Sequence, residues 1–353
     1  MSLPLLSARW MADALPSTLP AESRAPCLSC PMSVESAVGR PAAVAHFNPR
    51  TKCCTYLPNL RNFQVGGILS DAEPAMAHGQ RTVRQRMAEG VAVTPLGLGW
   101  PASFDAAYST DLDAHFGHNA SWRCPHYIDR DGGLCGVWRH RNAICSTWFC
   151  RYERGDVGKR LWRAVESMLT LAEQALVWWV LDELELEAAA VERLQRPSDP
   201  ACSLDGAVPI TEVMRRAVWG RWFGQEEDFF IEAARRVEPL SWAQVLQIGG
   251  PRLQARHEAL RLAMDDHDQT KLPPLLRLGQ LQTAHEDPDR LWVYSYRAYD
   301  AVPMRREVLD ALDALGLTTP DELTSALHEV GEPVSTETMR RWVDLAVLVP
   351  SFE

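Results

Sequence analysis

The stretch CPHYIDRDGGLCGVWRHRNAICSTWFC, residues 124–150, decides how the first half of this chain folds. It contains four cysteines, and four more lie upstream, as CLSC at residues 27–30 and as the adjacent pair in KCCTY at residues 52–56. The ninth cysteine, Cys202, stands alone in a polar segment. Thiolates are soft ligands, and sets of four suit zinc or iron–sulfur clusters. The eight predicted metal ligands are Cys27, Cys30, Cys53, Cys54, Cys124, Cys135, Cys145 and Cys150.

The composition is that of a globular protein, with 46% hydrophobic residues and a mean hydropathy of −0.21. A net charge of −10 gives no support to nucleic-acid binding through a basic surface. The N-terminus lacks the apolar core of a secretory signal, and the longest apolar run, around residues 176–181, is too short to span a bilayer. We therefore expect a cytoplasmic protein without a membrane partner. Thiols stay reduced in the cytoplasm, so clustered cysteines there indicate metal or redox chemistry more often than disulfides.

Hydrophobic periodicity predicts a mainly α (α+β) chain in four parts. These are a lead-in at 1–26, an irregular Cys-rich metal-binding domain at 27–155, a helical scaffold at 156–270, and a winged-helix-like domain at 271–353. Within the second part we expect a helix at 71–89, a Gly-Gly turn at Gly66 and Gly67, and a hairpin between Cys124 and Cys135. The scaffold should comprise one long helix at 156–195 and further helices at 210–222, 226–237 and 241–266, the last interrupted at residues 249–251.

The spacing of the eight cysteines resembles that of the YkgJ-type cysteine-cluster family over residues 27–150. The chain shows CxxC, then CC, then C-x10-C-x9-C-x4-C, with GGLCGVW before the last pair. The resemblance implies a zinc- or iron-chelating domain that uses these eight cysteines. The 22 residues between Cys30 and Cys53 exceed the family's usual spacing, and His140–Arg141–Asn142 stands where an Arg-Pro pair is expected. Flagellin lysine methylases carry a similar cysteine signature, but no GxGxG loop for S-adenosylmethionine is present.

Other side chains near the cysteines could serve the same centre. Four histidines cluster there, and each is more often structural than a ligand or proton carrier: His115, His118, His126 and His140. Six aromatic residues could shield a cluster from water or simply pack the core: Trp122, Tyr127, Trp138, Trp148, Phe149 and Tyr152. Three cations could offset the charge of bound thiolates or lie on the surface: Arg139, Arg141 and Arg151.

The last part of the chain reads as two strand-like runs joined by HEDPD and followed by three helices, at 304–315, 320–327 and 335–345. This β-β-α-α-α order resembles the PqqD-like winged-helix domain over residues 275–350, which implies peptide recognition. Residues 300–353 carry eleven acidic and four basic side chains, a balance opposite to that of a DNA reader. We therefore expect this domain to bind a protein or peptide partner and no nucleic acid.

Together these patterns predict a metal-binding protein with an iron–sulfur cluster, or else zinc, that acts as a redox or peptide/protein-modifying maturation factor. Whether it is an enzyme stays open at this point. Two alternatives remain: a non-catalytic zinc-binding adaptor, and a modifying enzyme that resembles the lysine methylases. A coordination position open to substrate would favour an enzyme, because structural zinc sites are closed.

Overall fold

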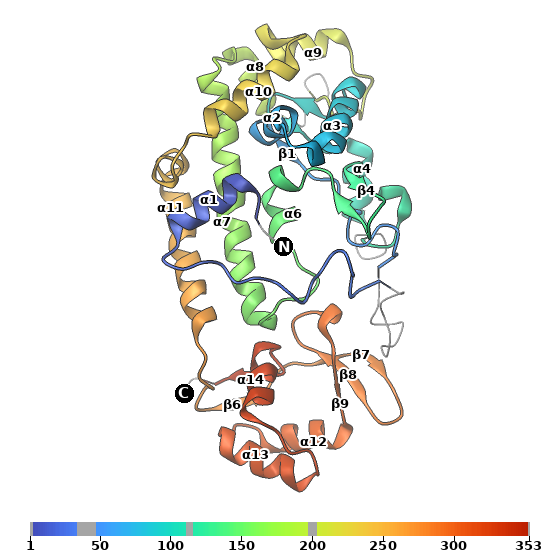
Figure 1. Cartoon of the computed structure of the whole chain (residues 1–353), viewed down its shortest axis with the longest axis vertical. Coiled ribbons are helices and arrows are strands. Elements are labelled where there is room, and N and C mark those ends of the chain that lie inside the picture. Colours follow the sequence, from blue (N-terminus) through green and yellow to red (C-terminus); the bar gives the residue numbers. More distant parts are fainter. Residues whose placement is uncertain (1–2, 34–46, 111–115, 197–202, 352–353) are drawn as a thin grey trace.

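The computed structural model describes residues 3–33, 47–110, 116–196 and 203–351. Within these ranges the protein is mainly helical with a few small sheets, which confirms the predicted predominance of helix (Figure 1). One large hydrophobic core extends from Trp10 to Met264, and a second core extends from Leu276 to Leu348. No helix among the described residues is long and apolar enough to cross a membrane.

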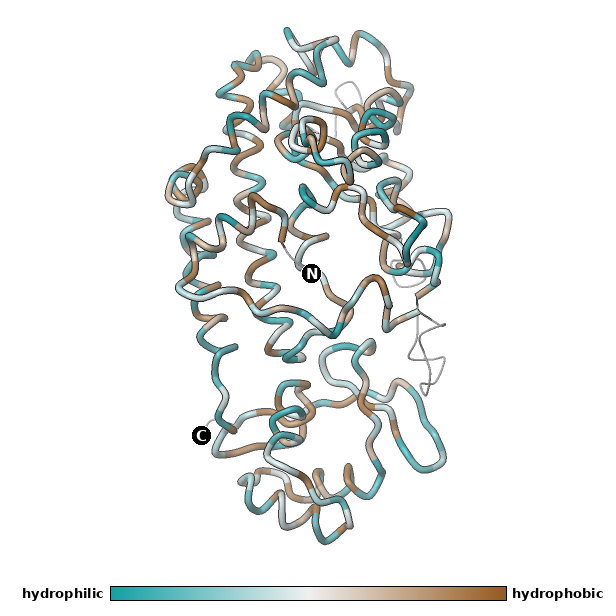
Figure 2. Tube along the Cα trace, viewed as in Figure 1, coloured by the Kyte–Doolittle hydropathy of each residue, from teal (hydrophilic) through white to brown (hydrophobic). Residues whose placement is uncertain are grey.

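Two long helices form the scaffold of the larger core. Helix α7 (Gly155–Glu183) buries an apolar stripe, and α11 (Trp242–Asp268) packs along it (Figures 1 and 2). The N-terminal helix α1 (Leu5–Ala14) packs against α11, and its Trp10 indole donates a hydrogen bond at 3.1 Å to the Leu240 carbonyl, just before α11 begins. Helix α11 bends at Gly250, whose positive φ of 64° and following proline interrupt the helix as the sequence predicts.

The prediction of one continuous helix at 156–195 is wrong, because the chain forms two helices there. Helix α7 ends at Glu183, Glu185 takes a left-handed φ of 49°, and α8 (Ala188–Leu194) starts anew. Such a residue cannot continue a right-handed helix, although the acidic sequence around it favours helix. The chain then forms α9 (Glu212–Trp219), the short 3-10 helix η6 (Gly220–Trp222) and α10 (Glu226–Val237), close to the predicted bounds.

The Gly-Gly turn predicted at residues 66 and 67 is also wrong, because helix α2 (Asn62–Ser70) runs through both glycines. They permit close packing instead. A Cβ atom at Gly66 would lie 1.7 Å from the Phe230 carbonyl oxygen in α10, and one at Gly67 would lie 2.5 Å from Nδ1 of His140. Helices α2 and α10 therefore approach each other more closely than any residue with a side chain would allow.

The Cys-rich part is built from short elements. Strands β1 (Leu60–Arg61), β3 (Gly97–Leu98) and β2 (Val93–Thr94) form one antiparallel sheet in that order. Helix α3 (Ala77–Glu89) follows the 3-10 helix η3 (Pro74–Met76) and ends at Gly90, as predicted for residues 71–89. The predicted hairpin is confirmed: β4 (Tyr127–Ile128) pairs with β5 (Leu134–Cys135), and Tyr127 faces Cys135. Helix α4 (Ala102–Thr110) and helix α6 (Ala143–Thr147) complete this part.

The C-terminal unit packs around the second core. Strands β7 (Gln282–Glu286), β8 (Leu291–Tyr294) and β9 (Val302–Met304) form a sheet, and the β7–β8 hairpin projects with a hydrophilic tip (Figures 1 and 2). The first strand-like run is divided, because β6 (Leu276–Leu278) pairs with β10 (Leu348–Pro350) instead of joining the hairpin. Three helices follow β9 in the sequence and precede β10, near the predicted ranges: α12 (Arg306–Leu315), α13 (Pro320–Glu329) and α14 (Thr336–Asp344).

Candidate metal centre

The eight predicted ligands come together from four segments of the chain. Six cysteines line one cavity of about 400 Å³: Cys27, Cys53, Cys54, Cys124, Cys135 and Cys145. Cys30 and Cys150 are both buried. They lie close to the other cysteines, since negative charge on Cys30 and on Cys27 would raise the pKa of Cys150. The cysteines therefore form one electrostatically connected group, although their positions span more than a hundred residues of sequence.

A buried lysine holds three of these segments in place. Lys52, only 8% exposed, takes a left-handed φ of 52° in the turn that presents Cys53 and Cys54. Its ammonium group donates hydrogen bonds to the Cys27 and Gly132 carbonyls. The amide of Cys124 adds a further link, since it donates to the Cys54 carbonyl at 2.9 Å.

Helix α6 carries Cys145 and is anchored at its start. Asn142 is the N-cap of this helix, and its side-chain oxygen accepts a hydrogen bond from the Cys145 backbone N–H at 3.0 Å. The Ala143 amide donates to the carboxylate of Glu173 at 2.7 Å, which ties α6 to the long helix α7. Glu173 is 4% exposed, and burial raises its pKa to about 7.

Burial keeps most of these thiols protonated in the absence of a bound cation. Desolvation raises the pKa of Cys135 to about 11 and that of Cys150 to about 12, and it raises the pKa of Cys145 and Cys124 strongly. Cys54 is the exception, because a hydrogen bond from the Cys53 thiol lowers its pKa. Metal binding at such thiols would release protons and would be favoured by higher pH.

Several groups oppose this effect of burial. Hydrogen bonds from the backbone act to lower the pKa of four of the cysteines: Cys30, Cys124, Cys135 and Cys150. The Arg141 guanidinium lowers the pKa of four thiols: Cys27, Cys54, Cys135 and Cys145. Donors and cations directed at sulfur favour the thiolate, which is the form that binds metals.

The donor set therefore fits a thiolate-bound metal in its chemistry. As the side chains are placed, no group of three or more His, Cys, Asp or Glu residues in the described part of the chain converges closely enough to hold an ion. Coordination would require the sulfurs to turn toward a common point, and the cavity between six of them leaves the space for that movement.

The remaining candidates of the sequence analysis occupy other positions. His126 is fully buried, and its Nδ1 lies 2.8 Å from the Thr82 hydroxyl, while burial lowers its pKa to about 3. His140 and Arg139 both pair with Asp71 at 2.8 Å. His118 is exposed, and no histidine lines the cavity within the ranges that the structure covers. His115 and Cys202 lie outside the described residues.

Of the aromatic residues predicted to surround the centre, Tyr127 and Trp148 line the cavity. Phe149 and Tyr152 pack edge-on in the core, with ring centroids 5.7 Å apart, whereas Trp138 is 37% exposed. Trp122 is half-buried and packs against Phe104 and Tyr108, with ring centroids 5.5 and 5.8 Å apart. Core packing therefore accounts for Phe149 and Tyr152, whereas Tyr127 and Trp148 also line the cavity.

Sequence reasoning missed several residues that line the cavity. Lys52 adjoins the cysteine pair and could have been found from that position alone. The aromatic residues Tyr56, Tyr108 and Phe116 and the C-terminal residues Arg297 and Tyr299 also line it. Arg297 and Tyr299 lie about 150 residues beyond Cys150, and no spacing or motif connects them to the cysteines.

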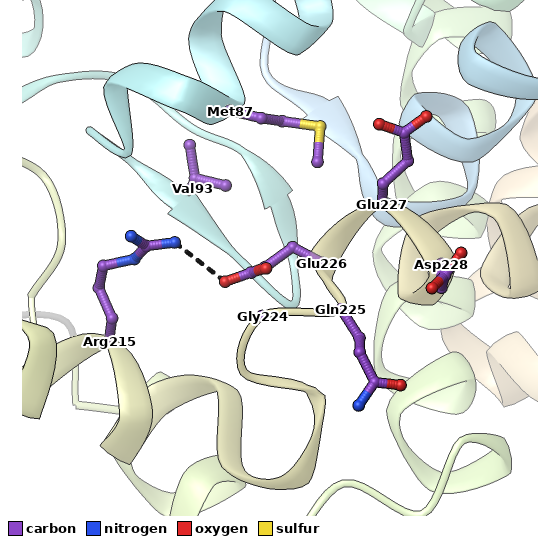
Figure 3. A pocket seen from close by; sticks show the side chains of 8 residues that line it. All are labelled: Met87, Val93, Arg215, Gly224, Gln225, Glu226, Glu227 and Asp228. Carbon is purple, nitrogen blue, oxygen red and sulfur yellow. Dashed lines mark hydrogen bonds and ion pairs between the residues drawn. The ribbon is translucent and has the colours of Figure 1, made fainter.

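A second hollow, of about 210 Å³, lies between α3, α9 and α10 (Figure 3). Three of its four charged side chains are already paired within the protein, since Arg215 contacts Glu226 at 2.9 Å and Glu227 contacts Arg84 at 2.8 Å. Paired charges of this kind leave little for a ligand to bind, so the cysteine-lined cavity is the better functional candidate.

Comparison of the chain with protein-family models, with curated proteins and with solved structures finds no match.

Proposed function

We propose that residues 27–150 form a thiolate metal centre of the YkgJ type, with an iron–sulfur cluster as the preferred occupant and zinc as the alternative. The observation that carries the proposal is that six cysteines from four segments of the chain line one cavity. Cysteines that serve only as small apolar side chains have no reason to gather around a common cavity. The eight cysteines would supply the thiolate ligands, and the bound metal would provide redox chemistry or act as a Lewis acid.

The cavity favours a working centre over a purely structural one. A structural zinc site is closed by its ligands, whereas about 400 Å³ lies beside six of the cysteines here. We therefore infer a redox or peptide/protein-modifying maturation factor, acting in the cytoplasm, with room for a substrate group next to the metal. A non-catalytic zinc adaptor is the second candidate, because zinc sites of four thiolates each would use the same cysteines.

The C-terminal unit, residues 271–353, is proposed to be a winged-helix-like module of the PqqD type that docks a protein or peptide partner. Its projecting β7–β8 hairpin and its acidic composition support this proposal, because a nucleic acid would be repelled.

Elemental analysis and a UV–visible spectrum of protein purified without oxygen test the metal proposal. We expect iron with acid-labile sulfide and a broad band near ~400 nm, as thiolate-bound clusters give. Cys135→Ser and Cys145→Ser should each remove metal, whereas the control Cys202→Ser should retain it. Zinc in place of iron would support the adaptor, and metal-free protein under these conditions would contradict the proposal.

A further inference from the structure

The cysteine-lined cavity is completed by the C-terminal unit. Residues 296–300, between β8 and β9, reach into the Cys-rich part, and the 3-10 helix η7 (Ala298–Asp300) lies within this connection. Its residues Arg297 and Tyr299 line the same cavity as the six cysteines. The two units are therefore joined at the candidate metal centre itself and not only through distant surfaces.

Arg297 is held against the chain immediately before Cys150. Its guanidinium donates a hydrogen bond to the Phe149 carbonyl and lies over the rings of Trp148 and Tyr152, with distances of 5.1 Å and 5.3 Å from the guanidinium carbon to the ring centroids. Arg297 therefore places a positive charge beside the last cysteine of the other unit and in the cavity that six further cysteines line.

The connecting segment is fixed on both sides of Arg297. Arg24 forms a two-pronged ion pair with the buried carboxylate of Asp300, at 2.6 and 2.7 Å. Lys159 in α7 donates to the Tyr296 carbonyl at 3.0 Å, and Arg151 donates to the Tyr299 carbonyl at 3.0 Å. Three cations of the larger unit thus hold the segment that carries Arg297, so its guanidinium has little freedom to leave the cavity.

We propose that Arg297 is a positioning residue which the C-terminal unit contributes to the cysteine centre, where its charge strengthens metal binding by the thiolates. Several thiolates around one ion carry net negative charge, and a guanidinium beside them in a water-poor cavity offsets that charge. Arg141 lines the same cavity from within the Cys-rich part. The inference rests on the proposed metal-binding function and adds a dependence on the C-terminal unit.

The test compares metal affinity in three variants of the full chain, with zinc as the probe ion and a chromophoric chelator as competitor. Arg297→Gln should weaken zinc binding by about 10- to 100-fold, the usual effect of losing a residue that supports metal ligands. Arg297→Lys keeps the positive charge and should retain most of the affinity. Arg154→Gln breaks an ion pair with Asp344 at the same junction but outside the cavity, and should leave the affinity unchanged. In protein that contains iron, Arg297→Gln should also lower the midpoint potential, because a positive charge stabilises the reduced cluster.

Three outcomes would overturn the inference. Equal losses in Arg297→Gln and Arg154→Gln would show that only docking of the units matters. Unchanged affinity in Arg297→Gln, with zinc still bound by the unmodified protein, would refute the role of Arg297 and leave the proposed metal centre intact. Absence of zinc and iron binding in the unmodified protein would refute both.

Discussion

The buried carboxylate of Glu173 offers the most quantitative test of how the scaffold supports the cysteine centre. Its Oε1 accepts hydrogen bonds from the Ala143 amide at 2.7 Å and from the Gln64 side chain at 2.8 Å. The Arg61 side chain is a distant ion-pair partner at 3.9 Å. Desolvation outweighs these contacts and raises the pKa of Glu173 from 4.5 to about 7. A glutamine at position 173 would keep the oxygen acceptor without the charge.

The sign of the pH effect follows from this raised pKa. Below pH 4.5 the side chain is protonated in the folded and the unfolded chain, so it contributes no pH dependence. Between 4.5 and about 7 the unfolded chain ionises first, and stability is lost as the pH rises through the folded pKa. A rise of this size corresponds to about 3 kcal/mol of unfolding free energy. Glu173→Gln should therefore match the unmodified protein near pH 4.5 and exceed its stability by about that amount above pH 7.

Urea denaturation at a series of pH values from 4.5 to 8 measures the effect. The difference between the unmodified protein and Glu173→Gln isolates this one group, because the other titrating groups, including Glu22 with a pKa raised to about 6 by burial, are common to both. Glu183→Gln, on the same helix but with a side chain 38% exposed, is the matched control and should give a curve parallel to that of the unmodified protein. Parallel curves for Glu173→Gln as well would refute the raised pKa of about 7 for the Glu173 carboxyl group.

Two further changes test the packing that surrounds the centre, each by the free energy of unfolding in urea. Gly66→Ala should destabilise the protein by about 1–3 kcal/mol, since its Cβ would meet the Phe230 backbone. The control Gly99→Ala, whose Cβ would have no neighbour closer than 3.6 Å, should be nearly neutral. Equal effects of the two substitutions would contradict the close approach of α2 and α10. Asp300→Asn should lower the free energy of unfolding by about 3 kcal/mol, because it leaves Arg24 without its carboxylate partner. The exposed control Asp289→Asn should lower it by almost nothing. If Asp300→Asn left the stability unchanged, the junction would not depend on this ion pair.

Local sequence patterns predicted those parts of the fold in which short-range chemistry dominates. The hairpin before Cys135 follows from its turn residues, since Asp131, Gly132 and Gly133 all adopt the positive φ that such residues tolerate. The glycines at 66 and 67 were misinterpreted because the same residue type serves turns and close helix contacts, and only the position of α10 distinguishes the two.

The sequence indicated the cysteines of the candidate site and, from the same stretch, its lining residues Tyr127, Trp148 and Arg141. The number and spacing of the cysteines indicate soft ligands, and the fold brings all eight into one region. The cations that act on them were not predictable in the same way. Arg141 could be named because it lies within the cysteine-rich stretch, but its effect on four thiols depends on the folded chain. Arg297 depends on the docking of a separate hydrophobic core, which no short-range pattern encodes.

The balance of forces on the sulfurs gives a reason for the arrangement of the two units. Burial alone favours neutral thiols, which bind metals weakly, and exposure would favour thiolates but would admit water and oxidants. Directed amides and nearby guanidinium groups reconcile burial with charge, because they stabilise a thiolate without solvating it. Arg141 does this from inside the Cys-rich part and Arg297 from outside it. A partner that moves residues 296–300 would therefore alter the charge around Cys150 without touching a cysteine.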